Sequence, residues 1–150
     1  MIRYQHVQIG YVLLVALGAG LVAISSIMWV SGFNWVGLLV MIILLVCLGL
    51  FAILTVRVDD ETLTVQFGPG VFPIVLQLRN VKTYRIVKNP WYYGWGIRYI
   101  FGGWLFNVSG FTALELQMNG GTRYRIGTDD PAGLLKAVEE ILANSPSRRS

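Results

Sequence analysis

Two long apolar runs, separated by four residues, dominate the N-terminal part of the chain. The first runs from about Ile9 to Val30 and the second from about Trp35 to Thr55, and no Asp, Glu, Lys, Arg or His occurs between Ile9 and Thr55. A helix that crosses the hydrocarbon core of a bilayer needs about 20 apolar residues. Inside lipid such a segment must satisfy its own backbone hydrogen bonds, so each run predicts a membrane-spanning helix.

The short segment between the runs, Ser31-Gly32-Phe33-Asn34, has the composition of a turn. Residues 9–55 therefore predict a transmembrane helical hairpin with spans at about 9–30 and 35–55. A cleaved signal peptide is a weaker interpretation, because the first run exceeds the usual 7–15-residue apolar region of a signal and a second run follows at once. A buried helix pair in a soluble protein is also disfavoured by two consecutive uncharged runs of this length.

Basic residues near the two runs predict their orientation. Arg3 precedes the first run and Arg57 closely follows the second, whereas the turn between the runs carries no basic residue. Because loops that are rich in Lys and Arg stay in the cytoplasm, we expect both termini on the cytoplasmic side. Residues 1–8 are then a cytoplasmic N-terminal segment of a multi-pass membrane protein.

Small residues recur at helical spacing on the first run, at Ala16, Ala19, Gly20 and Ala23. Such residues let two helices approach closely in a membrane. We expect this face to meet the second span. The alternative is contact with a partner or with another copy of the chain, which would make a homo-oligomer.

Beyond Thr55 the hydrophobic period changes to two, as in Leu63, Val65 and Phe67, which alternate with polar residues. This alternation is typical of strands with one buried face. The turns at Asp59–Glu61 and Asn119–Gly121 favour a meander of seven or eight strands, because Asn and Gly accept the backbone angles of tight hairpins. Further strands are expected near Ile74–Leu78, Val81–Val87, Ile97–Phe101, Trp104–Val108, Ala113–Met118 and Arg123–Ile126.

One amphipathic helix is predicted at the end of the domain. Thr128, Asp129 or Asp130 can cap it, and Pro131 suits its first turn. Its apolar face would cover an open edge or end of the sheet and consists of Leu134, Val138 and Ile141, with Leu135 and Leu142 beside them. The β domain with this helix spans residues 56–143, and residues 144–150 have the composition of a disordered tail.

Three segments carry a resemblance to a known family: Gly94–Arg98 (GWGIR), Gly103–Gly110 (GWLFNVSG) and Arg125–Pro131 (RIGTDDP). With the preceding spans, residues 54–142 resemble the bacterial membrane-anchored proteins that carry pleckstrin-homology-like (PH-like) domains. The resemblance implies a partly open antiparallel barrel of about seven strands, capped by the C-terminal helix, at the bacterial inner membrane. It implies no defined activity. Phosphoinositide binding does not carry over, because the acidic turn Asp59–Glu61 would repel a phosphate head group.

Charge and chemistry exclude several classes of function. The net charge of +4 is mild and no dense basic run occurs, so we expect no nucleic acid partner. His6 is the only histidine and Cys47 the only cysteine, which leaves no ligand set for a zinc site. No pairing of a nucleophile with a base is present. We therefore expect no cofactor, no metal and no enzymatic activity.

Two groups of residues are candidate contact sites. Strand order places the connections Gly68–Pro73 and Asn89–Gly96 near the membrane, and Trp and Tyr favour the membrane interface. The interface candidates are Phe72, Trp91, Tyr92, Tyr93 and Trp95; the alternative is that these rings fill the domain core. Candidate contacts for an anion or a partner are Arg85, Lys88 and Arg98; the alternative is that they are scattered, solvated charges.

Three functional hypotheses follow. The first is a non-enzymatic, membrane-tethered PH-like module that binds a protein or peptide at the cytoplasmic face. The second is a lipid- or envelope-related accessory protein whose aromatic loop contacts the membrane interface, with lipids as partners. The third and weakest is an enzyme with an unrecognised site.

Overall fold

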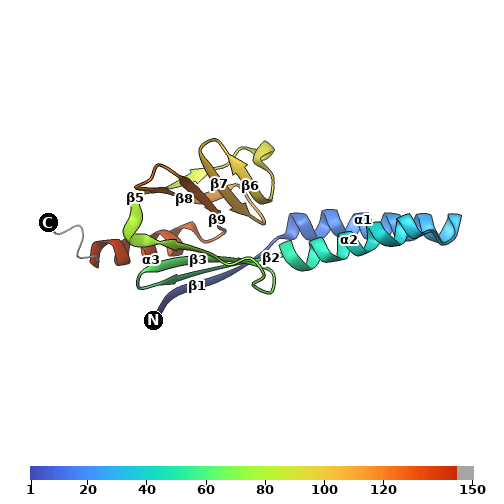
Figure 1. Ribbon diagram of the computed structural model, residues 1–150, viewed down its shortest axis with the longest axis horizontal. Coiled ribbons are helices and arrows are strands. Elements are labelled where there is room, and N and C mark those ends of the chain that lie inside the picture. The colour runs from blue at the N-terminus through green and yellow to red at the C-terminus, as the bar shows by residue number, and fades with distance from the viewer. Residues whose placement is uncertain (145–150) are drawn as a thin grey trace.

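A helical hairpin projects from one end of a β domain in the computed structural model, which describes residues 1–144 (Figure 1). The helices are α1 (Tyr11–Ser31), α2 (Trp35–Phe51) and α3 (Pro131–Asn144), with short 3-10 turns η1 (Leu78–Asn80) and η2 (Trp91–Tyr93). The strands are β1 (Ile2–Ile9), β2 (Ile53–Asp59), β3 (Thr62–Phe67), β4 (Ile74–Gln77), β5 (Val81–Lys88), β6 (Gly96–Ile100), β7 (Gly103–Asn107), β8 (Thr112–Met118) and β9 (Arg123–Gly127). The prediction of helices followed by a mainly β domain with a C-terminal helix is confirmed. Of the predicted tail, only Asn144 lies within the described residues, and it belongs to α3.

The two apolar helices differ in length. α1 has 21 residues and is long and apolar enough to cross a membrane, whereas α2 has 17 residues. At 1.5 Å per residue these are about 31 Å and about 26 Å long. The predicted second span was too long, because Ile53, Leu54 and Thr55 belong to β2. Composition does not separate the end of an apolar helix from the start of a strand that is buried in a core.

The N-terminal segment forms a strand that the sequence analysis did not predict. β1 pairs antiparallel with β2, with Gln5 opposite Arg57 and Gln8 opposite Leu54. Its inward residues are polar or amphipathic, whereas Val7 and Ile9 are exposed. The pattern of a half-buried strand is therefore inverted here, which explains why hydrophobic periodicity did not reveal it.

The strands form two separate sheets and not a closed barrel. One sheet has the order β1-β2-β3-β4 and the other has the order β5-β8-β9-β7-β6. The turns at Asp59–Glu61 and Asn119–Gly121 connect antiparallel neighbours, as predicted. The prediction of a purely antiparallel meander is wrong, because β7 and β9 pair in parallel. The β6–β7 hairpin lies beyond β9, so sequence neighbours are not always sheet neighbours.

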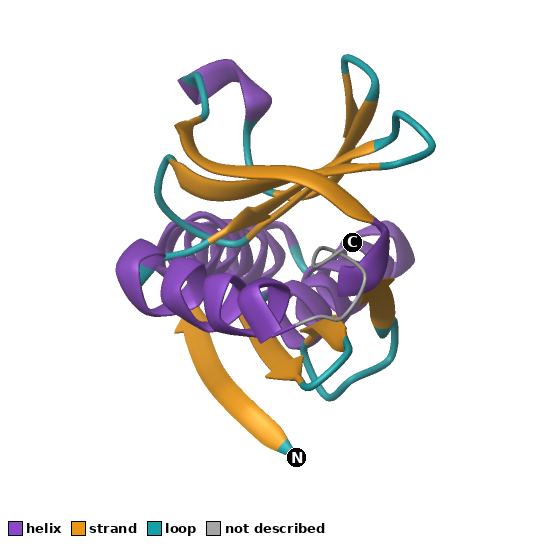
Figure 2. Cartoon of the chain, turned by 90° about the vertical axis from the view of Figure 1, so that its left-hand side faces the viewer, coloured by secondary structure: helices purple, strands orange, loops and turns teal. Residues whose placement is uncertain are grey.

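Helix α3 lies between the two sheets and completes their common core (Figures 1 and 2). Its buried residues are Leu134, Ala137, Val138 and Leu142. They join a single cluster with side chains from both sheets, including Leu54, Phe67 and Leu114. Asp130 caps the helix by accepting a hydrogen bond from the Gly133 amide at 3.0 Å, which confirms the predicted cap.

The hairpin continues directly into the β domain. The Gly10 amide donates to the Ala52 carbonyl at 2.7 Å where α1 and α2 meet β1 and β2. Phe51, the last residue of α2, packs edge-to-face on the buried Phe67, with ring centroids 5.8 Å apart. Phe51 and Leu13 of α1 both pack against the core cluster of the β domain. The junction is therefore a packed contact and not a flexible linker.

The domain has a hairpin-proximal end and a distal end. β1 and β2 meet the hairpin at Gly10 and Ala52, so their antiparallel order places the Asp59–Glu61 turn at the distal end. The loop after β3 returns to the hairpin: a Cβ added to Gly68 would lie 2.6 Å from the Gly49 carbonyl oxygen. η2 likewise lies on the hairpin side of the domain (Figure 1).

Gly68→Ala tests this close approach. Gly68 has φ +52, and an added Cβ would also lie 2.8 Å from the Leu50 carbonyl oxygen, so we expect a loss of about 2–4 kcal/mol in unfolding free energy. Gly70→Ala is the matched control, because Gly70 also has positive φ (+89) but its nearest neighbour would be 3.8 Å away. It should cost only about 1 kcal/mol. Chemical unfolding in detergent micelles measures both, and equal losses would contradict the proposed clash.

Candidate functional site

Aromatic side chains are exposed at the hairpin-proximal end of the domain. Trp91 and Tyr92 in η2 are 77% and 63% exposed, and Phe72 in the loop before β4 is also exposed. Phe111, in the loop before β8, is exposed at the same end. Its carbonyl accepts a hydrogen bond from the amide of Asn89 at 2.6 Å, which places it beside the segment that leads into η2. Sequence reasoning missed Phe111, since nothing local marks the side of the domain on which that loop lies.

The other two aromatic candidates turn onto the sheet. The ring of Tyr93 lies 5.6 Å from the guanidinium carbon of Arg125, a cation–π contact. Trp95 packs against Phe111, with ring centroids 6.2 Å apart. Both side chains are half-buried. They hold η2 against the domain and leave Trp91 and Tyr92 facing outward.

A buried carboxylate, that of Glu115, lies beneath the aromatic segment formed by residues 91–95. Glu115 is only 4% exposed, and the strand register places it between Arg85 on β5 and Arg125 on β9. Arg85 donates to its Oε1 at 2.7 and 2.9 Å, and Arg125 donates to its Oε2 at 2.7 Å. Arg125 also donates to the buried Asn89 side chain at 3.0 Å, which ties the start of the aromatic segment to the sheet.

The two arginines set the ionisation of Glu115. Burial by itself disfavours the carboxylate, but the hydrogen bonds from Arg125 and Arg85 outweigh it and hold the pKa of Glu115 below its ordinary value. Glu115 therefore stays ionised at neutral pH. It fixes Arg125, and through Arg125 it fixes Tyr93 and Asn89.

The basic residues that the sequence suggested do not converge on one site. Arg85 and Lys88 lie on β5 and Arg98 lies on β6, which are the opposite edges of the five-stranded sheet. Four strand spacings separate these edges, about 19 Å. Arg85 is engaged with Glu115, whereas Lys88 and Arg98 are exposed.

The inward residues of β1 bind the start of α3. Tyr4 donates its hydroxyl to Asp130 at 3.0 Å, and His6 Nε2 lies 2.5 Å from Asp129. The Gly133 amide and the Tyr4 hydroxyl lower the pKa of Asp130. Desolvation and the bond to Asp130 raise the pKa of the Tyr4 hydroxyl above its ordinary value. These polar contacts attach the unpredicted strand to the rest of the domain.

Gln8 makes a further attachment at the proximal end. Its buried side chain donates to the Ser109 carbonyl at 3.1 Å and to the Ser109 hydroxyl at 2.8 Å. The first sheet is thereby joined to the loop that carries Phe111. Among residues 1–144, no group of three or more His, Cys, Asp or Glu side chains is placed to hold a metal ion.

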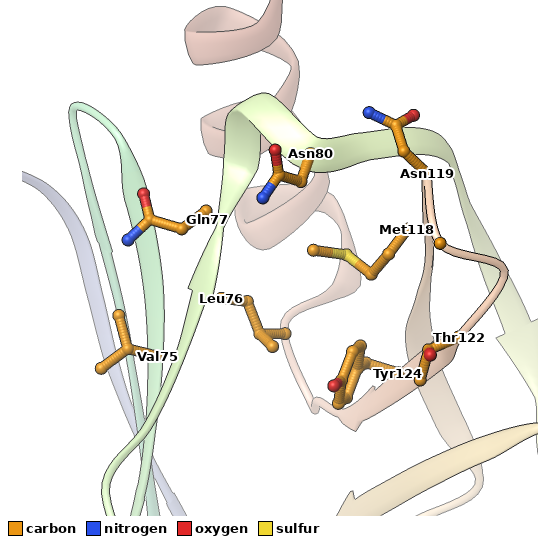
Figure 3. A pocket seen from close by; sticks show the side chains of 9 residues that line it. Val75, Leu76, Gln77, Asn80, Met118, Asn119, Thr122 and Tyr124 are labelled. Atoms are coloured by element: carbon orange, nitrogen blue, oxygen red, sulfur yellow. The ribbon is translucent and has the colours of Figure 1, made fainter.

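A pocket of about 340 Å³ opens between β4 and the β8–β9 hairpin (Figure 3). Leu76, Met118 and Tyr124 line its apolar part, and Gln77 and Asn119 contribute amide groups. The β8–β9 turn belongs to the distal end of the domain, away from the hairpin. No local sequence pattern predicts this pocket, because β4 and β9 are distant in the chain and lie in different sheets.

Comparison of the chain with protein-family models, with curated proteins and with solved structures gives no match.

Glu115→Gln tests the buried ion pair. Above about pH 5 we expect the variant to lose about 2–4 kcal/mol of unfolding free energy, because Arg125 then lacks a buried countercharge. The pKa of Glu115 is lowered by folding, so its stabilisation is present above the unfolded-state pKa of about 4.3 and is lost as pH falls through the folded pKa. The difference in unfolding free energy between wild type and variant should therefore become smaller at acidic pH.

Denaturant unfolding from pH 7 to pH 3, followed by intrinsic fluorescence, measures this gap. Glu139→Gln is the matched control, since Glu139 is exposed on α3, and it should change stability by less than about 0.5 kcal/mol. A gap for Glu115→Gln that does not vary with pH would show that the ionised carboxylate is not the stabilising species.

Proposed function

We propose that this chain is a non-enzymatic, membrane-anchored interaction module. In this proposal α1 and α2 both cross the membrane, and the β domain binds a protein or peptide partner at the cytoplasmic face. One observation carries it: an apolar hairpin that is almost wholly unburied continues directly into two paired strands of a well-packed domain.

Burial supports insertion of the whole hairpin. α1 has no buried residue, and in α2 only Gly37 is buried. In water so much exposed apolar surface would be strongly unfavourable, whereas in lipid it needs no other cover. The 17 residues of α2 fall at the lower end of the range for a span, about 17–25 residues.

Aromatic residues at both ends of the hairpin are consistent with two membrane interfaces. Trp29, Phe33 and Trp35 are exposed around the turn, and Tyr11 is exposed where α1 begins. Trp and Tyr concentrate at the boundaries of the hydrocarbon layer, where the ring and its polar group are both satisfied.

Of the small residues on α1, Gly20 contacts α2 within the hairpin and is not left for contact with another copy of the chain. A Cβ added to Gly20 would lie 3.4 Å from Leu44 Cδ1, so Gly20 faces α2 at close range. Ala16, Ala19 and Ala23 remain exposed and stay available to lipid or to another helix.

The assignment of residues 54–142 to the bacterial PH-like domains is part of the same proposal. It rests on the three segments GWGIR, GWLFNVSG and RIGTDDP, and a two-sheet domain with a C-terminal helix is compatible with it. The added strand β1 and the parallel β7–β9 pair are departures from a simple seven-strand pattern.

A second candidate function is contact with membrane lipid, because Trp91, Tyr92, Phe111 and Phe72 are exposed at the end that carries the hairpin. This surface would act as a second point of attachment. It would hold the domain in one orientation and direct its distal end into the cytoplasm.

Cysteine labelling tests the topology. In a Cys47→Ala background, Phe33→Cys in the turn should react with a membrane-impermeant maleimide on intact spheroplasts, because we place the turn outside. Lys136→Cys, exposed on α3, should react only after permeabilisation. Labelling of both positions from the same side would contradict two membrane crossings.

Quenching by brominated lipids tests the lipid contact. A variant that keeps only Trp91, with the other four tryptophans changed to Phe, should be quenched in nanodiscs. A variant that keeps only Trp104 is the matched control, because Trp104 lies near the distal end of β7 and should fluoresce unchanged. Equal behaviour of the two variants would rule out interface contact by η2.

A further inference from the structure

We propose that the free edge of β4 and the adjacent pocket bind an extended peptide segment of a partner protein by strand addition. This inference rests on the proposed interaction function and names its binding surface. The occupant is an extended chain with an uncharged apolar side chain that enters the pocket between β4 and the β8–β9 hairpin (Figure 3).

β4 differs from the other sheet edges. The edge strands of the two sheets are β1, β4, β5 and β6. Proteins commonly protect exposed edges with charged side chains, and Arg3, Lys88 and Arg98 are on β1, β5 and β6. β4 has the sequence IVLQ and carries no charge. It is therefore the edge most suited to pairing with another strand.

The register shows which backbone groups β4 offers. The Leu78 amide donates to the Glu61 carbonyl at 2.9 Å, so Leu78 and Glu61 form a hydrogen-bonded pair beside β3. Hydrogen-bonded and non-bonded pairs alternate along an antiparallel ladder. Leu76 consequently points its amide and carbonyl toward β3, whereas Val75 points its amide and carbonyl, and Gln77 its amide, toward the open edge.

These outward groups determine the form of the ligand. The amides of Val75 and Gln77 and the carbonyl of Val75 match the backbone of an extended peptide, whose edge groups also recur every second residue. Side chains of an added strand alternate between the two faces of the sheet, so every second one would face the pocket. Among residues 1–144, those that line that pocket are uncharged, and Leu76, Met118 and Tyr124 give it an apolar wall. An uncharged apolar anchor therefore complements it.

A second copy of this chain fits the edge less well. Antiparallel pairing of two β4 strands about a two-fold axis would put both β8–β9 turns on the same face of the joined sheet, where they would compete for space. The buried inward side chain Leu76 of the copy would not fill the pocket. The surface area that pairing along a four-residue edge can bury is also much smaller than the roughly 1,200 Å² that a stable dimer buries.

The place of β4 suits a soluble partner. The pocket includes Asn119 and Gly120 of the distal turn, so in the anchored protein it faces away from the membrane. A short edge and one anchor pocket predict weak, transient binding.

Substitution of Gln77 isolates the edge hydrogen bond. Gln77 already has φ −77, close to the value that proline requires, and its amide faces the open edge. Gln77→Pro should therefore leave the β3–β4 ladder intact and remove one donor to an added strand. Gln77→Ala is the matched control, because it removes the same side chain and keeps the amide.

The probe is a displayed library of random seven-residue peptides, selected on the full-length protein in nanodiscs. We expect enriched peptides with an aliphatic or aromatic residue at one fixed position. Fluorescence polarisation of these peptides should give affinities within threefold for wild type and Gln77→Ala, and at least tenfold weaker binding for Gln77→Pro. Circular dichroism and the melting temperature verify that each variant is folded.

A second pair of variants keeps the test decisive if Gln77→Pro does not fold. Thr122→Lys places a charge at the exposed rim of the pocket and should also weaken binding at least tenfold, whereas Thr83→Lys on β5 should not. Unchanged binding to both folded Gln77→Pro and Thr122→Lys would overturn the β4 site and leave the interaction function intact. Failure to enrich any peptide would overturn the β4 peptide site.

Discussion

The pairing of β1 with β2 is the contact on which the rest of the structure depends. The two strands continue the two helices of the hairpin, and the bond from the Gly10 amide to the Ala52 carbonyl closes the ladder where helix changes to strand. Helical hydrogen bonds end there, so the freed backbone groups must find partners across the pair. Because Phe51 and Leu13 also pack into the core, the orientation of the hairpin fixes the orientation of the domain.

Polar contacts then divide the domain into two ends. At the proximal end, Gln8 binds Ser109. Arg125, paired with Glu115, contacts Tyr93 and Asn89 and thereby restrains the segment that carries the exposed aromatic residues. At the distal end, β4 and the β8–β9 hairpin leave a pocket open. A domain with a restrained proximal end and an open distal end is well suited to present a binding edge away from a bilayer.

Part of the candidate site could be predicted from local sequence. Trp91 and Tyr92 could be identified from composition, because they belong to a cluster of four aromatic residues between Pro90 and Gly96, and Trp and Tyr favour a membrane interface. Arg85 was predicted as a candidate anion contact, but its hydrogen-bond acceptor Glu115 was not predicted. The two residues are 30 positions apart, and only the strand register brings them together. The β4 pocket also depends on a contact between two sheets.

The sequence by itself determined the apolar hairpin, most of the strands, the tight turns and the capped C-terminal helix, because each depends on residue spacing within one segment. Only the tertiary structure decided the role of residues 2–9, whose inward side chains are polar and gain their stability from Asp129, Asp130 and Ser109. It also decided the parallel β7–β9 pair and the exposed edge at β4. Those features arise from pairings between distant segments, and local hydrophobic periodicity does not encode which strands become neighbours.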